Sequence, residues 1–122
     1  MSKNGTLLLD GQTLINLEIL QNSVDGSETG TLLHLLNHAI TPFGKRLFKK
    51  WLCHPLRSVH HINERLDAVQ DFLNHSYVQV EIRKHFESLP DLERIVSRIQ
   101  AKACKLSDFL KALDGFSACL VN

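Results

Sequence analysis

A glycine–lysine pair, Gly44–Lys45, could end a phosphate-binding loop, because such loops hold phosphate on backbone N–H groups and reach it with a lysine. The full motif is G-x-x-x-x-G-K-[S/T]. In this sequence Ala39 replaces the first glycine, and Arg46 stands where the motif needs serine or threonine. Pro42 also removes one backbone N–H from the segment. The sequence therefore encodes no nucleotide site here, and we expect no cofactor-binding residue in the chain.

Histidine and cysteine side chains could hold a metal ion or act as nucleophiles, and the chain has seven histidines and three cysteines. His34 and His38 stand four residues apart, but the zinc pattern H-E-x-x-H is absent. Cys53 and His54 are adjacent, so their side chains diverge on a helix. We predict neither catalytic residues nor a metal site. We expect Cys53 to pack against apolar neighbours and the histidines to cap helices or face water.

A cluster of cations is the remaining candidate for binding chemistry. Five Lys or Arg residues and no acid lie between residues 44 and 57. Those on one helix face could contact DNA phosphates: Lys45, Arg46, Lys49 and Lys50. The alternative is a face that is solvated or paired with acidic side chains of another domain. Readout of bases is not expected, because Phe48 and Trp51 belong to the opposite, apolar face.

A helix must present these cations, and residues 42–53 have its pattern. Thr41 can cap the helix, Pro42 suits its first position, and Pro55 prevents its continuation. Apolar residues recur on the face opposite the cations: Phe43, Leu47, Phe48, Trp51 and Leu52. We expect this apolar face to anchor the fold, with Trp51 as its largest buried side chain.

The remainder of the chain has the pattern of short helices after an extended start. Apolar runs at residues 7–10 and 16–20 are short enough for strands, and Asp10 could cap a helical turn between them. Residues 21–30 are polar and form a loop. Apolar spacing predicts helices over five further ranges: 31–40, 58–73, 77–87, 92–100 and 107–120. The expected fold is all-α and multihelical, as one domain over residues 1–122, with short strands and loop in 1–30 and helices in 31–122.

Two helices carry further predictions about how the elements join. The helix over 58–73 has apolar residues spaced three and four apart: Val59, Ile62, Leu66, Val69 and Leu73. Asp91 is expected to cap the helix that opens with Leu92. Arg65 and Arg94 could join helices to carboxylates such as Asp91 or Glu93.

Composition limits the class of protein. Hydrophobic residues make up 43% and charged residues 22% of the chain, which is typical of a globular domain. The net charge is only +1, so any attraction to nucleic acid must be local. An odd number of cysteines without C-x-x-C argues against a disulfide framework and favours a reducing cytosolic or nuclear compartment. The apolar runs are too short for a membrane span, and the start of the chain lacks a signal peptide.

Four stretches together resemble the core domain of the MutS family of DNA mismatch repair proteins. They are LDGQTLINLEI, TPFGKRL-x-K-x-WL-x-HPL, I-x-x-RLDAV and LPDLER-x-x-x-RI. The resemblance covers the chain from Leu7 onward. Within the family the amino-acid sequence is most similar to that of a eukaryotic subunit of fungal type. No single stretch would be specific alone.

The resemblance implies that the chain corresponds to one segment of a larger protein. In the family this core and lever segment is multihelical and links an ATPase domain to a clamp that closes on DNA. It implies a nuclear protein whose partners are the other domains of its parent polypeptide and the second MutS homologue, with DNA contacted mainly through other domains and no membrane partner. ATP and Mg²⁺ serve the full-length family. The Walker A loop and the mismatch-reading Phe-x-Glu are not found here, and the chain resembles a fragment cut at 120–122, where the lever helix continues.

Two hypotheses follow. In the first, the chain is a structural and coupling segment of a mismatch repair protein, with no catalysis of its own. In the second, it is a free-standing helical module that binds nucleic acid through the basic face of residues 44–57.

Overall fold

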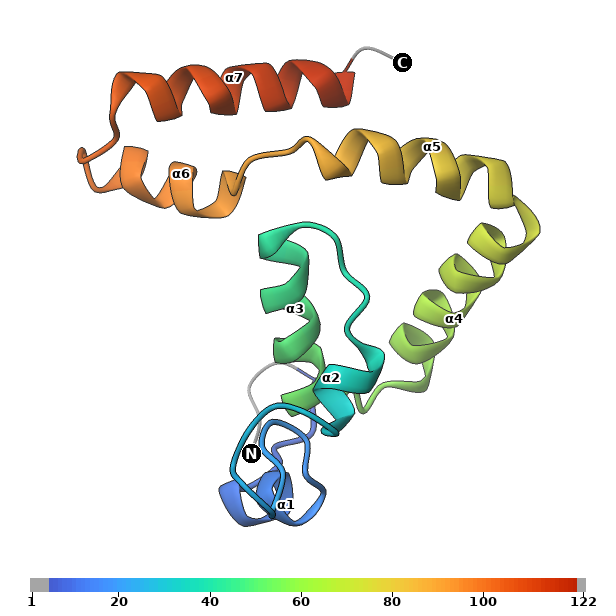
Figure 1. Cartoon of the computed structure of the whole chain (residues 1–122). Coiled ribbons are helices and arrows are strands. Elements are labelled where there is room, and N and C mark those ends of the chain that lie inside the picture. The colour runs from blue at the N-terminus through green and yellow to red at the C-terminus, as the bar shows by residue number, and fades with distance from the viewer. Residues whose placement is uncertain (1–4, 121–122) are drawn as a thin grey trace.

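The computed structural model describes residues 5–120, and in that part the chain forms α-helices joined by connections, the longest of which spans residues 17–31 (Figure 1). The predictions that concern residues 1–4 and 121–122 lie outside the described residues. The helices are α1 (Gly11–Asn16), α2 (Leu32–Leu36), α3 (Pro42–Cys53), α4 (Val59–Asn74), α5 (Ser76–Glu87), α6 (Leu92–Gln100) and α7 (Leu106–Leu120). The prediction of an all-α, multihelical fold is confirmed.

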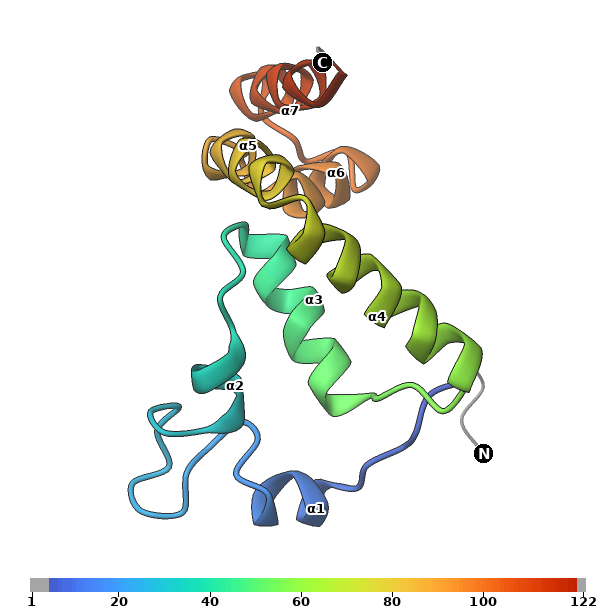
Figure 2. The ribbon, with the colours of Figure 1, turned by 90° about the vertical axis from the view of Figure 1, so that its right-hand side faces the viewer.

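The helices follow one another through an open arrangement and do not form a closed bundle (Figures 1 and 2). α1 and α2 lie at one end of the arrangement. α3 lies above them and is joined to α4 by the stacking of Arg65 on Trp51. α5 then leads to the pair α6 and α7 at the other end, which pack against each other. No helix among residues 5–120 is both long and apolar enough to cross a bilayer.

Side-chain caps set where most helices begin. Asp10 accepts a hydrogen bond from the Thr13 N–H at 2.7 Å and starts α1, as predicted. Thr41 likewise starts α3 by accepting from the Gly44 N–H at 3.1 Å, and Pro42 occupies the first position. Thr31 caps α2, which ends at Leu36, four residues earlier than predicted.

The predicted strands do not form in the described part of the N-terminal region. The first apolar run is extended, but it makes only an isolated antiparallel bridge between Thr6 and Leu56. The second run turns instead of extending, because Glu18 has a left-handed backbone with φ of 47°. The carbonyls of Glu18 and Ile19 then accept hydrogen bonds from Leu32 and Leu33 at 3.1 Å, which fixes the run to the start of α2.

The buried apolar core of the described residues is small and is divided between the two ends of the molecule. Its described members are Ile19, Leu33, Leu89, Ile95 and Ala112. The prediction that Trp51 is the largest buried side chain of an anchoring face is wrong, because Trp51 remains 41% exposed and Leu47 48% exposed. Within residues 5–120 no further layer of helices covers this face. The Arg65 guanidinium of α4 stacks on the Trp51 ring instead, 3.7 Å from its centroid.

A glycine in α7 allows the segment that starts α6 to approach closely. Gly115 is buried in the middle of α7, and a Cβ placed there would lie 3.2 Å from Leu92 and 3.3 Å from Pro90. Glycine lowers the intrinsic stability of α7, but the absence of a Cβ lets α7 pack tightly on the segment that starts α6.

Candidate functional site

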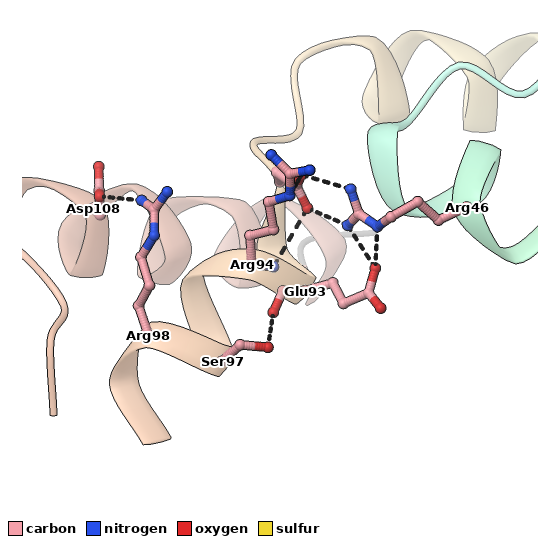
Figure 3. A network of polar contacts seen from close by, with 7 residues as sticks. Arg46, Glu93, Arg94, Ser97, Arg98 and Asp108 are labelled. Carbon is pink, nitrogen blue, oxygen red and sulfur yellow. Dashed lines mark hydrogen bonds and ion pairs between the residues drawn. The ribbon is translucent and has the colours of Figure 1, made fainter. Parts of the chain in front are cut away.

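A polar cluster joins two helices that are far apart in the sequence. Arg46 extends from α3 to the start of α6, where its Nη1 and Nη2 donate to the two Asp91 carboxylate oxygens at 2.9 and 2.6 Å (Figure 3). Its Nε also donates to Glu93 Oε2 at 2.8 Å. We name Arg46, Asp91 and Glu93 the Arg46 clasp. A bidentate guanidinium–carboxylate pair of this kind fixes orientation as well as distance.

Local structure places each member of the clasp. Asp91 is the N-cap of α6 and accepts a weaker hydrogen bond from the Arg94 N–H at 3.4 Å. Glu93 lies in the first turn of the same helix, where its negative charge interacts favourably with the positive end of the helix dipole. Arg46 lies in the second turn of α3, the helix that the Thr41 cap begins.

Electrostatics follows from these contacts. The hydrogen bonds from Arg46 hold the pKa of Asp91 below its ordinary value of 3.8. Burial acts in the opposite direction, but its effect on the pKa is smaller. The same contacts raise the pKa of Arg46, so it stays charged throughout. The Asp91 side chain is 22% exposed and that of Arg46 35%, so solvent partly screens the pair.

The two arginines predicted to join helices do not do so as expected. Arg94 lies 3.5 Å from Asp91, but within its own helix, and Arg65 stacks on Trp51 without reaching the clasp carboxylates. Arg46 takes this role instead. Sequence reasoning placed Arg46 among the exposed cations, and only the fold shows that α6 lies within its reach. A second inter-helix pair, Arg98 with Asp108 at 3.0 Å, joins α6 to α7.

The predicted DNA-binding cations have different environments. Arg46 is occupied by two carboxylates, as given above. Within residues 5–120, no ion pair is formed by the ammonium groups of Lys45, Lys49 or Lys50. Lys49 borders an open cleft of about 620 Å³ against α1 and the following loop, and Lys50 borders a groove of about 430 Å³ beside Leu92. Three cations thus remain available on α3.

The glycine of the Gly–Lys pair has a structural role. The Gly44 N–H is used by the Thr41 cap, and a Cβ at this position would lie 2.7 Å from Thr41 Oγ1. Two histidines act as helix caps, as predicted: the Nδ1 atoms of His54 and His75 lie 3.1 and 2.9 Å from the carbonyls of Lys50 and Asp71. No group of three potential metal ligands occurs in the described part of the chain.

Comparisons with known proteins give one consistent family. Residues 12–121 match the family described as MutS domain III. The chain is 48% identical over 111 residues to the DNA mismatch repair protein MSH6 of Saccharomyces cerevisiae, covering 91% of this chain and 9% of that protein. Human Msh6 is 40% identical over 133 aligned positions, covering 90% and 10%. The DNA mismatch repair protein MutS of Methanothrix thermoacetophila is 39% identical over 99 residues, covering 81% and 12%. The chain spans about a tenth of the length of these curated relatives.

The Thr41 cap gives a first prediction. Gly44→Ala should destabilise the protein by about 1 kcal/mol, because the new Cβ displaces the capping hydroxyl. In a Thr41→Ala background no cap remains to be displaced, so the same substitution should stabilise by up to about 1 kcal/mol through helix propensity. Urea unfolding of the four proteins measures both effects. Equal effects of Gly44→Ala in the two backgrounds would show that the cap does not require glycine.

The clasp gives a prediction about pH. Since Asp91 has a lowered pKa in the folded state, its contribution is complete above its unfolded pKa, near 3.8, and is lost as pH falls through the folded value. Asp91→Asn removes this charge but keeps a good N-cap residue. The wild-type protein should therefore be more stable than Asp91→Asn at pH 6, and the difference should shrink below about pH 4. Urea midpoints at a series of pH values test this, and a difference that is constant with pH would contradict it.

Proposed function

The chain belongs to the MutS family of DNA mismatch repair proteins, and from that premise we propose that it is a structural segment that couples an ATPase domain to a DNA clamp. It contributes no catalytic residue and needs no cofactor or metal of its own. The ATP and Mg²⁺ used by full-length family members would bind in other domains. The segment acts by holding helices in fixed relation while other parts of the protein change state.

The Arg46 clasp carries the coupling part of the proposal. It fixes α3 to the start of α6 across 45 residues of sequence, so movement of one helix is passed to the other. An α-helix is a stiff rod with a rise of about 1.5 Å per residue. Packed helices shift between discrete arrangements, so a few strong contacts can determine which arrangement is held.

The remaining parts of the proposal concern partners and location. The partners are the other domains of a longer mismatch repair polypeptide and, through them, the second MutS homologue in a heterodimer. The location is the nucleus, in line with the eukaryotic MSH6 relatives. DNA is contacted mainly by other domains, and one cation of the basic α3 face, Arg46, is already paired with carboxylates.

A domain exchange tests the coupling role. The matching segment of yeast MSH6, which is 48% identical, is replaced by this chain, and ATP turnover of the purified heterodimer is measured with matched and mismatched DNA. Arg46→Met should leave turnover on matched DNA unchanged and reduce the additional effect of the mismatch about fivefold. The reason is that α3 and α6 are no longer held together.

Lys49→Met is the matched control, because it removes a cation from the same helix without a carboxylate partner. It should behave like the unmodified exchange. A full mismatch response from Arg46→Met would overturn the coupling role. Weakened DNA binding by Lys49→Met alone would favour the second hypothesis, a nucleic-acid module using the basic face.

A further inference from the structure

The side chain of α4 that is best covered by the rest of the chain is a cation. Of the 16 residues of this helix, Arg65 alone is half-buried, and every other residue is exposed. An amphipathic helix ordinarily attaches through its apolar side chains. Those of α4 stay between 37% and 71% exposed: Val59, Ile62, Leu66, Val69, Phe72 and Leu73. The attachment of α4 therefore depends on Arg65 more than on apolar packing.

Arg65 is covered by the ring of Trp51 in α3. Its Cζ lies 3.7 Å from the centroid of the ring, a distance at which a planar guanidinium stacks on an aromatic face. We name this contact the Arg65–Trp51 stack. Within residues 5–120 Arg65 forms no ion pair with a carboxylate. In the described part of the chain, the stack is thus the contact that holds the Arg65 side chain against α3.

The connection between α3 and α4 is fixed separately from the stack. Two backbone hydrogen bonds, 2.6 and 3.0 Å long, anchor residues 55–57 to residues 5–7. Ser58 follows as the N-cap of α4, but the hydrogen bond that its Oγ accepts from the His61 N–H is long, at 3.5 Å. Because a long hydrogen bond constrains a helix start only weakly, Ser58 is the point at which α4 can change direction.

The ends of the two helices that lie away from Ser58 leave an open groove between them. Thr41 and Gly44 at the start of α3 border this groove, and so does Phe72 in the last turn of α4. Its volume is about 410 Å³, whereas a packed interior leaves few spaces larger than a water molecule. Close packing therefore does not fix the direction of α4 at this end.

We propose that the Arg65–Trp51 stack is a reversible contact that determines the direction of α4 relative to α3. When the stack opens, α4 turns about Ser58 and carries the start of α5 with it, because only His75 separates the two helices. A cation–π contact at a partly exposed site is weak, so it can open without unfolding the helices. The inference does not depend on the coupling role, because the Arg46 clasp joins α3 to α6 and not to α4.

Pulsed electron paramagnetic resonance tests the proposal on the whole 122-residue chain, with its three native cysteines replaced by alanine. Spin labels are placed through Lys45→Cys and Gln70→Cys, two exposed positions away from Ser58. The parent should give one narrow distance distribution. Arg65→Ala should widen it about twofold or more, because the contact that sets the direction is lost. Arg65→Lys should lie between the two, since it keeps the charge but not the planar stack.

Two further variants show whether the effect belongs to the stack. Glu64→Ala is the matched control, because the Glu64 carboxylate lies 3.4 Å from His60 of the same helix and makes no ion pair with α3. It should leave the distribution unchanged. Trp51→Leu should widen the distribution as Arg65→Ala does, and adding Arg65→Ala to it should have no further effect. Far-UV circular dichroism verifies the helix content of every variant.

Three outcomes would overturn the proposal. One is an unchanged distribution in Arg65→Ala with its helix content retained; if Arg65→Ala loses helix content, an unchanged distribution in Arg65→Lys decides in the same way. Another is a Glu64→Ala control that widens the distribution as much as Arg65→Ala. The third is further widening when Arg65→Ala is added to Trp51→Leu, which would show that Arg65 acts through some other contact.

Discussion

The structure depends on one arginine that holds two acidic side chains of a distant helix. The buried apolar core is small, and it lies in separate groups near α2 and between α6 and α7. Between these groups, Arg46 binds Asp91 on both carboxylate oxygens and Glu93 as well. This charge-assisted, bidentate geometry joins α3 to the start of α6 and thereby connects the two groups.

The open arrangement of the helices follows from the small size of the buried apolar core. The apolar stripes of the longer helices are paired with few partners within the chain, so many large apolar side chains stay exposed. The chain spans about a tenth of its relatives' length, and a surface of this kind is what a segment of a larger polypeptide would present to its neighbours. Stiff helices with few strong connections suit a part that passes movement on, whereas a closed bundle would resist it.

Much of the fold could be predicted from local signals. Asp10, Thr41 and Asp91 were identified as caps because short polar side chains before apolar repeats satisfy the free N–H groups at the start of a helix.

The burial of Trp51 was predicted wrongly, since an apolar face shows that a partner is needed but not whether the chain supplies one. The strand predicted at residues 16–20 does not form because the chain makes a left-handed turn at Glu18, which no local sequence pattern predicts. The clasp was missed because its members are 45 residues apart, and their meeting depends on the whole path of the chain.

A double-mutant cycle on the clasp is the most direct measurement of the central claim. Urea unfolding would compare the wild-type chain with Arg46→Met, Asp91→Asn and the double variant at neutral pH. If the clasp joins the two helices, each single substitution already removes the contact, and the double variant should be scarcely less stable than Arg46→Met. If the losses of the two single variants simply add, Arg46 and Asp91 do not act on each other and the two ends of the molecule are held by something else.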